Sequence, residues 1–330
     1  MTSAAILINY NDKSHTIKYA RELQSFNVFN KILIVDNCSP DEHDFSDIQR
    51  EFKEYAVVNE QAYLLELSHS QGVLGTTIIE VIKSDKNGGY NYAINFGIRY
   101  LESKGENYTF YMISNTDIVI REKAVKACLQ ELQNNPKTAV VAPRMRNMTG
   151  NYIRRDCWKE RTYKLDVIHS TRLLEALFYG KLRDAEYKEE DFMYLKDDKR
   201  LKVECISGSL FFIKSSVVKE MNYFDDNVFL FYEEDILYKK LQKLNPEYET
   251  ICLGNYDFTH LESQSIGKSL NYYKKMKQLY NSKMYYHKTY NNITKWQIAS
   301  YVLLWGCRQF EILFEIPVRK LMELIEEKFY

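Results

Sequence analysis

Acidic and amide side chains follow several short apolar runs of this sequence, and their types suit chemistry on a phosphorylated ligand. Asn115-Thr116-Asp117 follows the apolar run Thr109–Ser114. An acid at the end of a buried strand could hold a hard divalent cation such as Mn²⁺ or Mg²⁺ through oxygen ligands. Such a cation stabilises a nucleotide diphosphate as a leaving group. An Asp that caps the next helix gives the same pattern, so the triplet alone leaves both interpretations open.

A second group of acids, Glu233-Glu234-Asp235, follows an aromatic run and precedes a helical pattern. A carboxylate beside an apolar wall has a raised pKa and could take a proton from an acceptor hydroxyl. Acids in the first turn of a helix also complement its macrodipole, which is the simpler explanation of the pattern. A single helix start seldom carries three acids, and this block is therefore a candidate for the general base.

Three further positions carry groups that could contact a nucleotide. Asp36 ends a second apolar run, where its carboxylate could accept the N3–H of a uracil or thymine ring, although Asp is also an ordinary turn residue. The turn Asn87-Gly88-Gly89-Tyr90 precedes a helix and would let backbone N–H groups approach a phosphate or sugar. His260 could ligate a metal or contact a phosphate, although a lone His is more often structural.

These residues lie between elements that alternate in type over residues 1–142, and this alternation predicts a parallel sheet covered by helices on both faces. Ligands of such sheets lie beyond the carboxyl ends of the strands, so Asp36, Asn87 and Asp117 should meet at one edge. The predicted strands are Ala4–Ile8, Ile32–Val35, Ile78–Ile82, Thr109–Ser114 and 138–142, with helices near 15–26, 41–55, 91–103 and 121–134.

The rest of the chain is less regular. The stretch 56–77 reads as an insertion, and 143–200 is charged and irregular with one helix near 166–180. Regular patterns return with a strand pair or one long strand at 203–214, a short helix, a helix after Asp235 and a late strand at 249–253, and Tyr256–His260 closes this part.

Composition excludes several classes of protein. The 330 residues include 45 Lys and Arg against 45 Asp and Glu, and such a neutral chain is not expected to bind nucleic acid through phosphate neutralisation. The six cysteines are scattered without metal-ligand spacing. The N-terminus lacks a signal peptide, and no apolar run approaches the ~18 residues of a membrane span. We therefore expect a cytoplasmic protein, with peripheral contact at the inner face of the cell membrane as an option.

The composition changes beyond Glu262, because no Asp or Glu occurs before Glu311 while Lys, Tyr and Trp side chains alternate. Residues 268–330 carry 11 Lys and Arg against 5 Glu, so the neutral total hides a net charge of +6 in this segment. A basic helical face with Tyr and Trp beside it suits an anionic membrane interface, with 268–310 in contact. A helical appendage packed on the main domain and a homodimer contact are the alternatives.

Taken in order, these residues resemble the inverting family 2 glycosyltransferases with the GT-A fold, most of all those that elongate bacterial polysaccharides with rhamnose and related sugars. The resemblance covers about 1–265, and the ordered set is more specific than any single motif. The matching motifs are Ile8-Asn9-Tyr10-Asn11, Val35-Asp36-Asn37-Cys38-Ser39, Asn87-Gly88-Gly89-Tyr90, Asn95-Phe96-Gly97, Asn115-Thr116-Asp117, Gly208-Ser209-Leu210-Phe211-Phe212, Phe224-Asp225, Tyr232-Glu233-Glu234-Asp235 and His260 with a nearby Ser.

This resemblance implies a Rossmann-like α/β fold of GT-A type, with a mostly parallel central sheet flanked by helices. Residues 1–265 would form the glycosyltransferase domain, with the nucleotide-binding part at about 1–142 and the acceptor part at about 143–265. Residues 266–330 would form a basic, aromatic, helical C-terminal region.

The resemblance also implies the reaction and its residues. A UDP- or dTDP-linked sugar would be transferred with inversion to a hydroxyl of a growing cell-surface glycan, expected to be lipid-linked. The implied nucleotide-sugar site comprises Tyr10, Asp36, Asn87, Gly88, Asn95 and Asn115, with Tyr10 stacking near the base that Asp36 reads. Asp117 would ligate Mn²⁺ or Mg²⁺, supported by His260. The metal motif begins with Asn instead of Asp, which removes one charge from the site.

The general base would be Glu234 or Asp235, because the acid block aligns with the family pattern in two registers; we take Asp235.

Two other classes of function remain open. A nucleotidyltransferase or another nucleotide-sugar enzyme on a similar sheet would need a glycine-rich N-terminal loop with basic residues, where this chain has Asn9-Tyr10-Asn11. A catalytically silent protein that binds a glycan or a partner would be expected to lose the acids at 117 or 234 and 235, which are present. The dinucleotide fingerprint of oxidoreductases is absent.

Overall fold

A single mixed sheet of nine strands forms the centre of the molecule. This computed structural model describes residues 2–52, 77–153, 156–178, 187, 191, 200–261 and 272–329, with side chains up to 315. Strand β8 (Arg200–Val203) pairs with β11 at one side of the sheet. The other strands follow the order β3 (Ile78–Lys83), β2 (Lys31–Asp36), β1 (Ser3–Asn9), β4 (Phe110–Asn115), β10 (Leu210–Lys214), β6 (Thr138–Arg146), β11 (Glu249–His260) and β5 (Ile118–Ile120).

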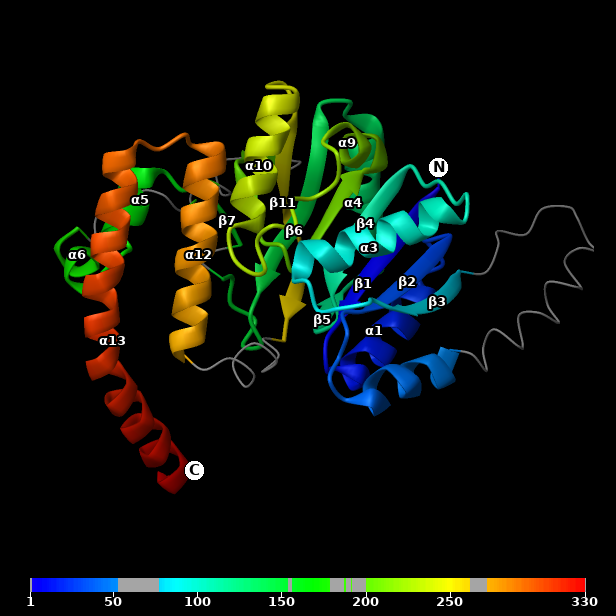
Figure 1. The fold of residues 1–330 in the computed structure, drawn as a ribbon. Helices are drawn as coiled ribbons and strands as arrows, with labels where there is room; N and C mark the ends of the chain where they lie inside the picture. Colours follow the sequence, from blue (N-terminus) through cyan, green and yellow to red (C-terminus); the bar gives the residue numbers. More distant parts are fainter. Residues whose placement is uncertain are drawn as a thin grey trace, which may run out of the picture.

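Successive side chains of the central strands are buried on opposite faces of this sheet, as the period of two in a strand requires. In β1, Ala4, Ile6 and Ile8 belong to one apolar cluster, and Ala5 and Leu7 belong to the other. Helix α3 (Tyr90–Ser103) covers the first face, and α1 (Lys13–Ser25) and α4 (Glu122–Asn134) cover the second (Figure 1). The prediction of a sheet with helices on both faces is confirmed.

The direction of the strands changes within the sheet. The pairs β1–β2, β1–β4 and β2–β3 are parallel, as predicted for the first half of the chain. Strand β10 comes from the second half and inserts between β4 and β6, antiparallel to both. The parts at about 1–142 and 143–265 therefore share one sheet, and their residues meet at its centre.

Several element boundaries differ from the sequence-based expectation. Two helices, α5 (Tyr163–Ile168) and α6 (Arg172–Leu177), occupy the region of the single predicted helix 166–180, because Thr171 caps a new helix start by accepting a hydrogen bond from the Leu174 N–H. Strand β11 continues to His260, beyond the predicted strand at 249–253, and β5 was not foreseen. Except for Thr77, the predicted insertion 56–77 lies outside the described residues.

The chain ends in two helices that lie beside the sheet domain. Helix α12 (Tyr272–Tyr290) contacts both α13 (Lys295–Phe329) and α10 (Glu233–Leu244), as Figure 1 shows. The remaining short elements are β7 (Cys157–Trp158), β9 (Cys205–Ile206) and α9 (Ser215–Glu220). The predicted helical C-terminal region is confirmed. In the part of the chain that the structure describes, none of the helices combines the length and apolar character needed to cross a membrane.

The glycine turn before α3 is fixed by a close approach of two backbones. Gly89 has a φ of +96°, and a Cβ atom built on it would lie 2.3 Å from the Phe229 carbonyl oxygen. The Tyr90 N–H donates to the same carbonyl at 3.4 Å. Only glycine fits this position, because any side chain would meet both a disfavoured φ and the 229 backbone.

We predict that Gly89→Ala lowers the free energy of unfolding by roughly 2–4 kcal/mol, since backbone strain and overpacking add. Gly105→Ala is the matched control, because Gly105 also has a positive φ but its added Cβ would meet no atom within 4 Å. That variant should lose only about 1 kcal/mol. Urea unfolding of both variants measures the difference, and equal losses would show that the contact with Phe229 is unimportant.

Candidate active site

A cavity of about 420 Å³ lies where the acid block at the start of α10 faces the end of β4. Its walls come from six separate stretches of the chain, so it exists only in the folded protein. The residues that line it are Tyr90, Asn115, Trp158, Arg161, Ser207, Gly208, Ser209, Leu230, Phe231, Tyr232, Glu233, Glu234, Asp235 and Leu279.

The backbone of Gly208 joins three of the predicted motifs in this cavity. Its N–H donates to Glu234 Oε1 at 3.0 Å, and its carbonyl accepts from the Tyr90 hydroxyl at 2.7 Å. One residue further on, the Ser209 carbonyl accepts from the Asn115 N–H at 2.8 Å. The glycine turn, the end of β4 and the acid block are thus brought together; the sequence had predicted the first two for the ligand edge of the sheet, but not the acid block.

Asp235 is held by donors from the segment before α5. It is 1% exposed, and its Oδ1 accepts from the Arg161 N–H at 2.8 Å. Its Oδ2 accepts from the Trp158 indole N–H at 3.3 Å. Two donors fix the direction of the carboxylate, and each oxygen has a second lone pair for a substrate hydroxyl.

Burial governs the protonation of this acid block. It raises the pKa of Asp235 to about 7, even though the neighbouring Arg161 lowers it. Burial also raises the pKa of Glu234, and burial followed by the charge of Glu234 raises that of Glu233. A carboxylate with a pKa near neutrality can accept a proton efficiently at physiological pH, which is the property of a general base.

The chain enters α10 through two consecutive left-handed residues. Phe231 has a φ of 73° and Tyr232 a φ of 71°, which side chains larger than glycine rarely adopt. The Tyr232 hydroxyl donates to Asp166, and its ring packs on Tyr286 with centroids 5.3 Å apart. These contacts stabilise the strained turn that places the acid block against the cavity.

Asp166 is the centre of a fully buried polar cluster that joins this turn to the C-terminal helices. His287 Nε2 lies 2.7 Å from Asp166 Oδ2, and Lys283 Nζ lies 3.7 Å from Oδ1. Burial alone would raise the pKa of Asp166, but Lys283, His287 and Arg161 outweigh it and hold that pKa well below its usual value. Helix α12 therefore braces the wall that carries the candidate base.

The predicted metal residues lie side by side. His260 Nε2 is 3.1 Å from Asp117 Oδ2, and β11 pairs with β5 so that His260 stands opposite Ile118. The described residues contain no group of three His, Cys, Asp or Glu side chains that could hold a metal. Mg²⁺ commonly takes only one or two carboxylates from the protein and completes its shell with phosphates and water. This pair of donors suits such an ion, and metal binding stays a prediction.

Asp36 lies at the same edge of the sheet, in a buried network. It is 0% exposed, and its oxygens accept from Asn9 Nδ2 at 2.7 Å, Ser39 N–H at 3.0 Å and Ser39 Oγ at 2.6 Å. Asp44 joins the network through Asn9, while Tyr10 at the end of β1 is partly exposed. The described residues leave one lone pair of Asp36 for a base, and its role in reading a pyrimidine stays a prediction.

Two of the predicted binding residues, Asn95 and Asn87, form hydrogen bonds within the protein in this structure. The amide of Asn95 is 3% exposed and bonds the Phe224 backbone in both directions, at 2.8 and 3.0 Å. Asn87 accepts from the Asn37 amide at 3.1 Å. A Cβ on Gly88 would lie 2.3 Å from the Tyr92 ring. Asn95 and Asn87 thus fix the loop at 224 and the turn before α3, and their contact with a ligand stays a prediction.

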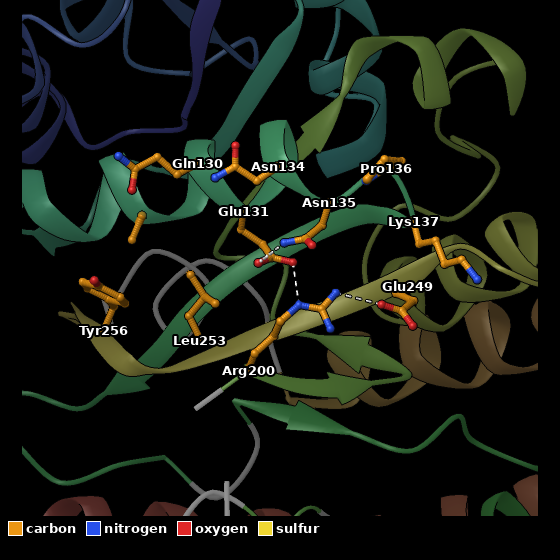
Figure 2. Close-up of a pocket in the computed structure, with 11 residues that line it drawn as sticks. Gln130, Glu131, Asn134, Asn135, Pro136, Lys137, Arg200, Glu249, Leu253 and Tyr256 are labelled. Atoms are coloured by element: carbon orange, nitrogen blue, oxygen red, sulfur yellow. Dashed lines mark hydrogen bonds and ion pairs between the residues drawn. The ribbon is translucent and has the colours of Figure 1, made fainter. Parts of the chain in front are cut away.

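A larger cavity, of about 650 Å³, lies between α4, β8 and β11, where Figure 2 shows its lining residues. Arg200 points into the middle of this cavity and pairs with Glu131 at 2.7 Å and Glu249 at 2.8 Å. No residue of the sequence-predicted site lines it. Its central cation, Arg200, is engaged by two carboxylates, so the smaller cavity at the acid block is the candidate active site.

Sequence reasoning missed several residues of this site. Arg161 and Trp158 lie in the irregular stretch 143–200, and Asp166 follows them without any motif. Only their contacts with Asp235 and Tyr232 reveal them. Gly208 and Ser209 stood in the family pattern, but no role was assigned to them.

One family of known proteins matches this chain over most of the sheet domain. Residues 6–194, more than half of the chain, match the model of the family described as Glycosyl transferase family 2. The match ends before the acid block and His260. No curated protein matches the chain.

Many solved structures are similar to this chain, among them the following two. The crystal structure of GalNAc-T7 with UDP, GalNAc and Mn²⁺ has a TM-score of 0.50 and 11% identity, over 79% of this chain and 44% of that one. The crystal structure of S. aureus TarS has a TM-score of 0.48 and 12% identity, over 88% of this chain and 44% of that one. The chain thus spans less than half of either protein. The first likeness supports the fold and nothing further.

We predict that Asp166→Ala destabilises the protein by roughly 3–5 kcal/mol, because Lys283 and Arg161 would lose a buried counter-charge. Asp257→Ala is the control, since the Asp257–Arg146 pair is 3.0 Å long but partly exposed to water and should contribute less than about 1 kcal/mol. Thermal unfolding at neutral pH measures both variants. A shift no larger than that of the control would mean that the cluster does not brace the site.

Proposed function

From the premise that this chain belongs to glycosyl transferase family 2, we propose that it transfers a sugar from a nucleotide-diphosphate sugar to a hydroxyl of an acceptor glycan. One observation carries the proposal: the glycine turn, the end of β4 and a buried acid block with a near-neutral pKa face one cavity. In an open α/β sheet this is the edge where ligands bind.

The chemistry that fits this cavity is a single in-line displacement. Asp235 accepts the proton of the acceptor hydroxyl while the oxygen of that hydroxyl attacks the anomeric carbon of the donor sugar. The bond from that carbon to the diphosphate oxygen breaks at the opposite side, and the nucleoside diphosphate leaves with the electron pair. One displacement inverts the configuration of the sugar. Arg161 and Trp158 hold Asp235 in the direction of attack, which contributes through orientation.

A divalent cation, Mn²⁺ or Mg²⁺, would be held by Asp117 and His260 and would supply stabilisation of the negative charge on the departing diphosphate. The donor set supports this assignment, because imidazole and carboxylate together suit Mn²⁺ and a single carboxylate with phosphates suits Mg²⁺. The first solved structure contains UDP and Mn²⁺, which accords with this choice.

The donor is proposed to be UDP- or dTDP-linked, on the basis of the remaining acceptor site of Asp36 and the partly exposed Tyr10 beside it. The acceptor is proposed to be a growing cell-surface glycan, lipid-linked, as the resemblance to polysaccharide-elongating enzymes suggests. Membrane contact of the segment 268–310 stays a prediction. In α12 such contact could not involve Lys283 or Tyr286, because both side chains are buried against the domain.

We predict that Asp235→Asn lowers kcat by roughly 10²–10⁴, the usual contribution of a general base, without loss of folding. Glu234→Gln should lose less, because Gln still accepts the hydrogen bond of the Gly208 N–H. Asp117→Asn should raise the Mn²⁺ concentration needed for half-maximal rate.

Transfer and hydrolysis assays with UDP-, dTDP- and GDP-sugars measure these effects. Full activity of Asp235→Asn would remove it as the base, and a preference for GDP would contradict the role given to Asp36.

The pH dependence should follow from the raised pKa of Asp235. A base acts in its ionised form, so kcat/KM should fall as the pH drops through about 7, the value that burial imposes on this carboxylate. The assay compares rates between about pH 5.5 and 8.5 at saturating Mn²⁺. The midpoint should move in Asp235→Glu, and a profile that is flat across this range would rule out Asp235 as the titrating group.

A further inference from the structure

The outer face of α13 carries a continuous apolar surface. From Trp296 to Phe314, the exposed positions lie on one side of the helix and include no charged residue. We call this surface the α13 stripe; it consists of Trp296, Ala299, Val302, Leu303, Gly306, Cys307, Phe310, Leu313 and Phe314. Its six large side chains are each between 54% and 87% exposed.

The stripe is not needed to attach α13 to the domain, because the opposite face of the helix does this. Tyr301 and Ile312 are 1% exposed on that face, and Arg308 is 8% exposed. Arg308 pairs with Glu311 at 2.8 Å and Glu315 at 2.6 Å, and it donates to the Tyr272 hydroxyl of α12. Helix α13 thus has one face packed on the domain and one that the described residues leave uncovered.

The size of the stripe is that of a protein interface. Aromatic side chains bury ~150–250 Å² each when covered, so three aromatic and three aliphatic side chains at these exposures present on the order of 800 Å². Apolar patches on monomers rarely exceed ~300–600 Å². About 800 Å² is the contribution of each partner to a standard interface.

The charges around the stripe favour a protein partner over an anionic membrane. Between 295 and 315, α13 carries Lys295 and Arg308 against Glu311 and Glu315, so its net charge is zero. The one cation in the middle of this range, Arg308, is turned inward. Attraction of a helix to an anionic membrane surface is supplied by exposed Lys and Arg, which this face lacks.

The pattern of the stripe suits a second identical helix. Trp296, Leu303 and Phe310 recur every seven residues, and so do Ala299, Gly306 and Leu313. A repeat of seven is the spacing at which helices pair along a seam. Small residues at Ala299 and Gly306 leave room for close approach, and a Cβ on Gly306 would meet no atom within 4 Å. Nothing among the described residues therefore blocks a partner at the middle of the stripe.

We propose that the α13 stripe is the interface of a homodimer, in which the stripe of one copy packs on the same stripe of a second copy. A two-fold interface is self-complementary, so the middle of the stripe faces its own counterpart. This holds for parallel and for antiparallel helices, and it places Cys307 of one copy near Cys307 of the other.

Sedimentation velocity of the full chain over a range of concentrations tests the proposal. The wild type should sediment as a dimer, and the double variant Leu303→Glu/Phe310→Glu as a monomer with an unchanged circular dichroism spectrum. Met148→Glu is the control, because Met148 is 71% exposed and lies outside the stripe. It should leave the dimer intact.

Cysteine cross-linking provides a second test. Of the six cysteines, Cys307 is exposed, Cys38 is intermediate and the other four are buried. A short bismaleimide should therefore give a covalent dimer of the Cys38→Ser chain, and Cys307→Ser should abolish it. Absence of this product would overturn the proposal, as would a wild type that remains monomeric.

Flotation with anionic vesicles tests whether a membrane, instead of a second copy, covers this surface. If the monomeric chain binds vesicles and Leu303→Glu/Phe310→Glu abolishes that binding, the stripe is a membrane contact and the homodimer is refuted. Vesicle binding that the double variant retains, together with a wild-type dimer, leaves the stripe as the dimer interface.

Discussion

Three carboxylates lie together in the first turn of α10, with Glu233 and Asp235 buried and Glu234 partly buried, and much of the surrounding structure serves to keep them there. Burying neighbouring acids in their ionised form is unfavourable, and their pKa values therefore rise. The donors that limit this cost come from distant parts of the chain. Glu234 bonds the Gly208 backbone, and Asp235 bonds the Arg161 backbone and the Trp158 indole.

This constraint explains why the C-terminal helices are part of the site. The turn into α10 has two left-handed residues, and the second, Tyr232, is anchored by Asp166 and Tyr286. Asp166 is itself paired with His287 and Lys283 of α12. The C-terminal helices are therefore more than an appendage packed on the main domain. Their inner face supports the wall that carries the candidate base, while the α13 stripe is left uncovered by the described residues.

The strand ends supply the other half of the site. Asp117 and His260 are more than a hundred residues apart in sequence, and the pairing of β5 with β11 brings their side chains to 3.1 Å. The motif at 115–117 was recognisable because an acid directly follows a buried strand. His260 could be linked to it only through the order of motifs, since a lone His has no pattern of its own.

The sequence by itself determined the class of fold and the order of the first elements, because strand and helix periods, glycine turns and strand-end acids are local signals. Of the site residues predicted from it, Asn115, Glu234 and Asp235 line the candidate cavity. The predicted strands near 4–8, 32–35 and 109–114 coincide with β1, β2 and β4. Only the tertiary structure decided that Asn95 bonds the 224 backbone and that Asp36 is enclosed by Asn9 and Ser39. It alone also revealed Arg161 and Asp166. Burial, hydrogen-bond partners and pKa depend on residues that are remote along the chain, and no local pattern encodes them.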